Sequence, residues 1–120
     1  MRYLDVSDNQ IAFVYGGDIW LAPKVGGTAF QLTHSPGEES WPRFSPAGDY
    51  IAYTASYNGN EDVYVISAGG GLPTRITYQS HADRMIDWHP NGEQIIFASG
   101  RQSGRQAIRQ FYKVDKDGDL

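Results

Sequence analysis

The sequence predicts an all-β fold made of three copies of one four-stranded antiparallel unit. The chain repeats itself about every 40 to 44 residues, and each copy consists of short apolar runs separated by Gly- and Pro-containing turns. No segment has the apolar spacing of an amphipathic helix. One apolar motif returns in each copy, as Ile11-Ala12-Phe13, Ile51-Ala52-Tyr53 and Ile95-Ile96-Phe97. Self-similarity at this period in strand-like sequence is typical of β-propeller blades.

The second repeat shows the four strands of a blade most clearly, and we name them A to D from the propeller centre outward. These strands are predicted at residues 41–45, 50–55, 62–67 and 73–77. Pro46 and Gly48 lie in the A–B turn, where proline presets φ and glycine accepts a positive φ. Pro73 suits an outermost strand because it has no N–H to donate to an inner ladder.

The other two repeats differ from the second in their connections. Repeat one aligns with repeat two without a gap over strands A and B, so Tyr3 is expected at the position of Arg43. Repeat three has a long B–C connection, predicted at residues 100–109, followed by strand C at 110–114 and no strand D. We therefore predict one partial propeller domain over residues 1–120, whose third blade lacks its outer strand. The predicted blades are at about residues 1–40, 41–84 and 85–120.

Composition and charge argue against several classes of function. The formal net charge is −4 and the pI is about 5.2, so we expect no binding to nucleic acid or to an anionic membrane surface. No apolar run approaches the roughly 18 residues of a membrane-spanning helix, so no membrane insertion is expected. The chain has no cysteine and no export signal at its start, which leaves both a cytoplasmic and an exported location open.

The sequence contains no motif for catalysis or for a cofactor. Nucleophile signatures such as Gly-x-Ser-x-Gly, zinc signatures such as His-Glu-x-x-His and phosphate-binding loops are all absent. His34 and His81 lie in the two predicted crossovers between blades, where solvated loop residues are expected rather than metal ligands. We therefore predict that the chain by itself is not an enzyme and uses no metal or cofactor.

Charged residues at two places form the predicted binding site. In a propeller the B–C and D–A connections emerge at the same rim, and long loops on a rigid scaffold commonly bind ligands. The residues assigned to this rim are Glu38, Glu39, Asp83, Arg84, Arg101, Arg105 and Arg109. Arg43 and Asp87 occupy equivalent positions on two inner strands, where they are expected to line a central channel. Ordinary solvated loop charge is the alternative interpretation of the rim.

The order of these motifs resembles the TolB-type propeller repeat, and more narrowly the start of the N-terminal six-bladed propeller of tricorn-type serine peptidases. The resemblance covers essentially the whole chain and rests on residues 11–15, 18–20, 31–33, 36–39, 42–46, 57–64 and 75–78. In that family the peptidase chemistry lies in later domains, so the resemblance implies no catalytic residue here. It implies a non-catalytic module that binds peptide or protein and filters substrates. The alternative is a TolB-like scaffold for protein partners without any peptidase.

The open faces of a three-blade arc predict self-association. Propeller blades pack face to face, so the first and the third blade each expose an apolar face when no neighbour is present. Two copies related by a two-fold axis would cover both faces and give six blades, the number that the resemblance implies. The chain is thus predicted to be half of a six-bladed propeller that closes as a homodimer. A small hydrolase with its site at the centre of such a dimer is a third alternative.

Overall fold

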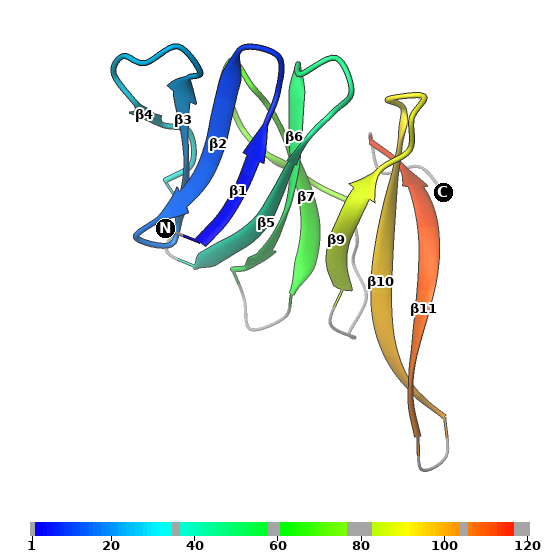
Figure 1. Cartoon of the computed structure of the whole chain (residues 1–120). Helices are drawn as coiled ribbons and strands as arrows, with labels where there is room; N and C mark the ends of the chain where they lie inside the picture. The colour runs from blue at the N-terminus through cyan, green and yellow to red at the C-terminus, as the bar shows by residue number, and fades with distance from the viewer. Residues whose placement is uncertain (1, 35–36, 58–60, 77–82, 104–105, 117–120) are drawn as a thin grey trace.

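Three antiparallel sheets stand side by side in the computed structural model of the chain, which describes residues 2–34, 37–57, 61–76, 83–103 and 106–116 (Figure 1). The first sheet contains β1 (Arg2–Val6), β2 (Gln10–Tyr15), β3 (Asp18–Pro23) and β4 (Phe30–Gln31). The second sheet contains β5 (Glu38–Phe44), β6 (Tyr50–Ser56), β7 (Asp62–Ser67) and β8 (Thr74–Arg75). Both sheets pair their strands in sequence order. The predicted all-β fold of four-stranded antiparallel blades is confirmed.

The third sheet has three strands within the described residues, in the order β11–β10–β9. They are β9 (Asp83–Trp88), β10 (Gln94–Ser103) and β11 (Gln106–Asp115). The last two form a hairpin that extends beyond the other blades (Figure 1). The loop predicted at residues 100–109 is therefore wrong, because the two strands continue to pair as far as Ser103 opposite Gln106.

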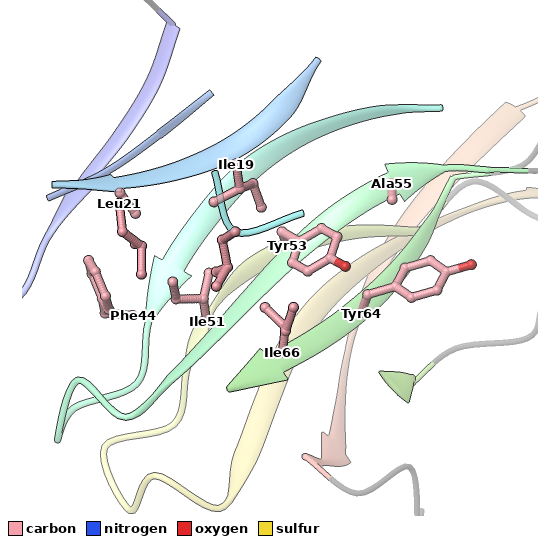
Figure 2. Close-up of a cluster of buried hydrophobic side chains, with 10 residues drawn as sticks. Ile19, Leu21, Phe44, Ile51, Tyr53, Ala55, Tyr64 and Ile66 are labelled. Atoms are coloured by element: carbon pink, nitrogen blue, oxygen red, sulfur yellow. The ribbon is translucent and has the colours of Figure 1, made fainter. Parts of the chain in front are cut away.

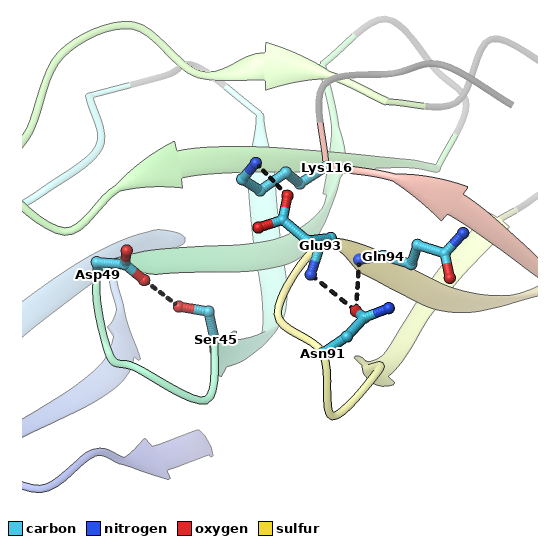
Figure 3. A network of polar contacts seen from close by, with 6 residues as sticks. All are labelled: Ser45, Asp49, Asn91, Glu93, Gln94 and Lys116. Carbon is cyan, nitrogen blue, oxygen red and sulfur yellow. Dashed lines mark hydrogen bonds and ion pairs between the residues drawn. The ribbon is translucent and has the colours of Figure 1, made fainter.

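Short polar side chains build the turns between strands A and B. In the second blade, Ser45 Oγ donates to Asp49 Oδ1 at 2.7 Å and accepts from the Tyr50 backbone N–H at 3.1 Å. In the third blade, Asn91 Oδ1 accepts from two backbone N–H groups that follow it, at 2.9 and 3.3 Å (Figure 3). Gly48 has φ 79°, which explains why a glycine ends the Pro-containing turn. Similar tight turns thus result from two different sets of hydrogen bonds.

The core lies between the blades rather than within any one of them. Ile19 and Leu21 of the first blade belong to one cluster with Ile51 and Tyr53 of the second, and all four side chains are 0% exposed (Figure 2). The cluster between the second and third blades contains Ala52, Val63, Val65, Ile76, Trp88, Ile95 and Phe97. The second sheet is thus buried on both faces, and this is why β6 and β7 carry apolar residues at successive positions.

The ladder registers identify equivalent positions in the three blades. In the first, second and third blades, the A–B pairs nearest the turn are Val6–Ile11, Phe44–Ile51 and Trp88–Ile95, respectively. The next pairs away from the turn, in the same order of blades, are Asp5–Ala12, Arg43–Ala52 and Asp87–Ile96. Asp5 therefore stands at the position of Arg43, and the expectation from sequence that Tyr3 does so is wrong.

A shorter turn in the first blade causes this difference. The Ser7 backbone N–H donates to the Gln10 carbonyl at 2.9 Å, whereas in the second blade the Ser45 N–H donates to the Tyr50 carbonyl at 2.8 Å. The first A–B turn is thus two residues shorter, and strand A is displaced along the sequence by that amount. A gap-free alignment misses the change because the apolar motif of strand B stays in place.

We expect Ile51→Ala to destabilise the chain by about 2–5 kcal/mol, because this buried side chain packs between two blades and its truncation leaves a cavity. Val25→Ala is the control, since Val25 is 98% exposed and its loss should change the unfolding free energy by about 0.5 kcal/mol or less. Urea denaturation followed by circular dichroism measures both. Equal effects of the two substitutions would contradict a core located between the blades.

Candidate functional site

Three charged side chains occupy the same position on the inner strands of successive blades. Asp5 on β1, Arg43 on β5 and Asp87 on β9 are equivalent by register, so an acid, a base and an acid follow one another around the arc. All three line one open groove of about 520 Å³, which we call the inner-strand groove. The equivalence predicted for Arg43 and Asp87 is confirmed, and Asp5 adds a third member.

The inner-strand groove has a mixed polar lining. Besides the three equivalent residues, it is lined by the charged Asp8 and Lys24 and by the hydroxyl-bearing Ser7 and Ser45. Three carboxylates and two cationic groups therefore border a space within the size range of ligand pockets. This set offers donors and acceptors to a ligand that carries both signs of charge, as a peptide does.

Hydrogen bonds between blades fix the backbone on both sides of the groove's central residue. Asp5 Oδ2 accepts from the Phe44 backbone N–H at 2.8 Å, which ties the second blade to the first. The Trp88 indole Nε1–H donates to the Arg43 carbonyl at 2.9 Å, which ties the third blade to the second. Because both bonds use backbone groups at or next to Arg43, all three blades hold this residue in place.

Arg43 keeps most of its hydrogen-bonding capacity available to a ligand. Its side chain is half-buried, and among the described residues its Nη1 donates to the Pro42 carbonyl at 3.2 Å. A guanidinium has about five N–H donors, so several of them remain for a ligand's carbonyl or carboxylate oxygens. Asp87 is exposed, and its Oδ1 accepts from the Trp88 backbone N–H at 2.8 Å.

Glu39, predicted as an exposed rim residue, is instead buried at the junction of the first two blades. β5 begins at Glu38, three residues before the predicted start of strand A, so Glu39 lies inside a strand and is 2% exposed. Its carboxylate accepts from Thr33 Oγ1 at 2.6 Å and from the Tyr57 hydroxyl at 2.7 Å. The sequence placed Glu39 outside the strand because the predicted strand begins at Trp41, whereas pairing with β6 already begins at Glu38.

A second carboxylate lies beside Glu39 in this junction. Asp18 Oδ2 accepts from Gln31 Nε2 at 3.0 Å, while Asp18 Oδ1 is buried without a hydrogen-bond partner in the described structure. Burial raises the pKa of Glu39 from 4.5 to about 7, against the hydrogen bonds from Thr33 and Tyr57 and with a smaller contribution from Asp18. The junction therefore favours the protonated form of Glu39 more strongly than water does.

The equivalent place in the second blade carries an ion pair instead. Asp62 is the register equivalent of Asp18 and is 0% exposed, and its Oδ2 lies 2.6 Å from Arg75 Nη2. Arg75 stands where Gln31 stands in the first blade, since both residues pair with the aromatic residue of strand C. A neutral amide in the first blade thus takes the place of the cation of this ion pair.

The remaining predicted rim residues lie in strands or outside the described part of the chain. Glu38 is exposed at the start of β5. Asp83 and Arg84 are the first two residues of β9. Arg101 lies in β10 and Arg109 in β11, the two strands of the hairpin. Arg105 lies outside the described residues. The structure therefore brings Arg43 and Asp87 to one groove, and it does not place Glu39 with them.

Sequence reasoning missed Asp5 and Lys24 in the groove. A signal for Asp5 was present, because the segment Ser7-Asp8-Asn9 is too short to match the longer turn that starts at Ser45. Counting back from the turn serine, rather than forward from the first residue, aligns Asp5 with Arg43. No repeat pattern points to Lys24, which follows β3 and reaches the groove only through the fold.

The described part of the chain contains neither a metal-binding cluster nor a membrane-spanning helix. No group of three or more His, Asp or Glu side chains is arranged to hold a metal ion there. Within the same residues there is also no helix long and apolar enough to span a bilayer. His34 is exposed, and His81 lies outside the described residues.

Four-stranded antiparallel blades that bury their faces against one another, with a polar groove at their inner strands, define a β-propeller domain. The sequence matches the family described as the tricorn protease N-terminal β-propeller domain over residues 1–120, and the chain belongs to that family. Its repeats are also of the TolB-like type.

Similar proteins agree with this assignment. Tricorn protease homolog 1 of Streptomyces coelicolor is 35% identical over 117 residues, which cover 96% of this chain and 11% of that protein. A second tricorn protease homolog of the same organism is 32% identical over 125 residues, covering 99% of this chain and 11% of that protein. The crystal structure of TolB from Acinetobacter baumannii is 29% identical, with a TM-score of 0.68, over 89% of this chain and 27% of that one. The chain thus spans about a tenth of the tricorn relatives.

We expect the unfolding free energy of the chain to fall as the pH rises from 4.5 to 8. Glu39 has a pKa of about 7 when folded and near 4.5 when unfolded, so the folded state binds the proton more tightly between these values. The proton's contribution is complete below pH 4.5 and is lost as the pH rises through 7. At about 1.4 kcal/mol for each unit of pKa, the loss is about 3 kcal/mol.

Glu39→Gln should remove this part of the pH dependence, because the amide cannot titrate. Urea denaturation of both proteins at pH 5, 6, 7 and 8 measures the difference. Glu38→Gln is the matched control, since Glu38 is exposed on the same strand. Identical slopes in the wild type and in the Glu39→Gln variant would contradict the assignment of the proton to Glu39.

Proposed function

We propose that the chain is a non-catalytic propeller module that binds extended peptide or unfolded protein segments in the inner-strand groove. The observation that carries the proposal is Arg43, whose guanidinium keeps donors available at the centre of a groove that three blades hold together. Membership of the tricorn N-terminal propeller family supports it, because peptides are the substrates that the names of the tricorn relatives imply. In a longer parent protein, this module would select peptides before they reach a peptidase domain.

The groove suits a peptide better than a small ligand of one charge. Carboxylates at Asp5, Asp8 and Asp87 accept amide and ammonium N–H groups, while Arg43 and Lys24 donate to carbonyl and carboxylate oxygens. The groove is open rather than enclosed, so a chain can pass through it. The likeness to TolB favours a second candidate, a scaffold for folded protein partners without any peptidase.

We expect Arg43→Gln to weaken peptide binding about tenfold or more, since it removes a charge-assisted donor from the centre of the groove. The probe is a fluorescein-labelled nonapeptide of Gly and Ser that carries two Glu residues, titrated with the chain and followed by fluorescence anisotropy. Lys116→Gln is the charge-matched control, because Lys116 pairs with Glu93 and does not line the groove. Absence of binding by the wild type would overturn the proposal, and equal weakening by both variants would remove Arg43 from it.

We further propose that two copies close into a six-bladed ring, each contributing three blades at about residues 1–40, 41–84 and 85–120. The face of the first blade that points away from the second is apolar and open: Leu4 is 51%, Val6 44% and Tyr15 68% exposed. Single exposed apolar residues are common, but a row of them on one face of a sheet is typical of an interface.

The second blade shows what normally covers such a face. Its equivalents of Val6 and Tyr15 are Phe44 and Ala55, which are 7% and 1% exposed because the first blade packs on them. The partner that fits this open apolar face is therefore another blade, packed through the face that normally covers a neighbour. We propose that the third blade of a second copy supplies this covering face, and two-fold symmetry would make both contacts identical.

Light scattering during size exclusion should give a mass of twice 13.4 kDa at micromolar concentration. Val6→Asp should give a monomer, because it places a charge in the centre of the proposed interface. Val25→Asp is the control, since Val25 is 98% exposed outside that face, and it should leave the mass unchanged. A wild-type monomer over the whole concentration range would contradict the closed ring.

A further inference from the structure

Strands B and C of the third blade continue to pair beyond the point at which the same strands end in the first blade. In the first blade the last pair is Tyr15–Asp18, and the two glycines between these residues, both with a positive φ, close the hairpin as a tight turn. The register equivalent of this pair in the third blade is Ser99–Gln110. A two-residue turn at that position would therefore be enough to complete the blade.

Four further pairs continue the hairpin past this position, and we call their residues, 100–103 and 106–109, the hairpin extension. β9 pairs with β10 only as far as Ser99, and β11 is an outer strand of the sheet. Within the described residues, both edges of the extension are thus unpaired. Figure 1 shows the extension projecting away from the other blades. At about 3.4 Å per residue, it reaches roughly 14 Å past the end of the blade.

The charge of this hairpin is opposite to that of the chain as a whole. Residues 94–114 contain four of the 10 Lys and Arg residues of the chain and none of its 14 Asp and Glu residues, although the net charge of the chain is −4. Arg101 and Arg109 lie in the hairpin extension itself. Basic residues on an edge strand discourage pairing with another basic strand, but they favour pairing with an acidic one.

A fourth strand in the third blade would leave the extension open. In the first blade, strand D pairs with only two residues of strand C, Trp20 and Leu21, and the second blade has the same arrangement. The register equivalents of these two residues in the third blade are Tyr112 and Lys113, which lie outside the extension. The edge of β11 at residues 106–109 is therefore not the place where a blade receives its own outer strand.

The open edge and its charge together indicate the kind of partner. An unpaired strand edge binds an extended segment through main-chain hydrogen bonds, and side-chain pairs across the new ladder set the preference. A second copy of the same extension fits poorly, because it would bring two arginine-bearing strands together. A segment rich in Asp and Glu fits well, since it offers carboxylates to Arg101 and Arg109 as well as main-chain groups to the edge.

We propose that the hairpin extension binds an extended acidic segment of a partner protein, which adds to the edge of β11 at residues 106–109 as a further β-strand. This site is separate from the inner-strand groove. Ser7 and Ser45 place the groove at the A–B turns, whereas the extension continues from the opposite end of strand B. The inference therefore goes beyond the proposed function and does not depend on it.

A fluorescein-labelled nonapeptide of alternating Thr and Glu tests the proposal by fluorescence anisotropy. The wild-type chain should bind it at least tenfold more tightly than the same peptide with Lys in place of Glu. It should show the same preference over a form that is N-methylated at two adjacent central residues, because N-methyl groups block both edges of a strand. Equal affinity for the N-methylated form would indicate charge attraction alone, which nucleic acid would also experience, and would overturn strand addition.

Two variants of the full chain locate the site. In the first, Gly-Gly replaces residues 100–109, which gives the third blade the turn of the first. It should bind the Thr–Glu peptide at least tenfold more weakly and unfold within a few degrees of the wild type, because it keeps the ladder as far as Ser99–Gln110. In the second, Arg101→Gln combined with Arg109→Gln should weaken binding at least threefold with the strands intact. Unchanged binding by both variants would overturn the proposal.

Arg43→Gln separates this site from the inner-strand groove. It should leave the affinity for the Thr–Glu peptide unchanged and weaken only the Gly- and Ser-based peptide, whereas the Gly-Gly variant should do the reverse. If Arg43→Gln abolishes binding of the Thr–Glu peptide while the Gly-Gly variant binds it normally, the extension is not the site. A lower light-scattering mass of the Gly-Gly variant would show that a second copy occupies the edge, and would overturn the acidic partner. Absence of binding by the Gly- and Ser-based peptide alone would contradict the proposed function and leave this inference standing.

Discussion

The packing of one blade's apolar face on the next is the constraint on which the rest of the structure depends. Among the described residues, the buried apolar side chains form two clusters, each between neighbouring blades, so a single blade has no separate core there. The second blade shows the consequence most fully: Ile51 faces the first blade, while Ala52 and Val65 face the third. Because the stacking brings neighbouring inner strands together, Asp5 can accept a hydrogen bond from the Phe44 backbone, and Trp88 can donate one to the Arg43 backbone.

The close packing of neighbouring blades has different effects at the two ends of strand β5. At the Arg43 end, Asp5 and Trp88 from the two neighbouring blades hold the backbone, and the charged side chain stays available at an open groove. At the Glu39 end, the side chain itself is buried between blades, and burial raises its pKa to about 7. One seven-residue strand thus combines a charged side chain at an open groove with a carboxyl group buried in the junction.

The two junctions also show how repeats diverge without losing their geometry. Gln31 and Arg75 occupy the same place, and their aspartates open strand C in both blades. An arginine forms an ion pair with the buried aspartate in the second blade, whereas a glutamine donates a neutral hydrogen bond to its counterpart in the first.

The sequence by itself determined the fold class, the repeat, most strand positions and the equivalence of Arg43 and Asp87. These follow from local physics: alternation of apolar residues, turn residues with restricted φ, and the fixed spacing of repeated motifs. Only the tertiary structure decided the burial of Glu39, the positions of Asp5 and Lys24 in the groove, and the pairing that extends the β10–β11 hairpin. Each of these depends on which segments meet in space, and a two-residue change in one turn was enough to displace an entire inner strand against the sequence pattern.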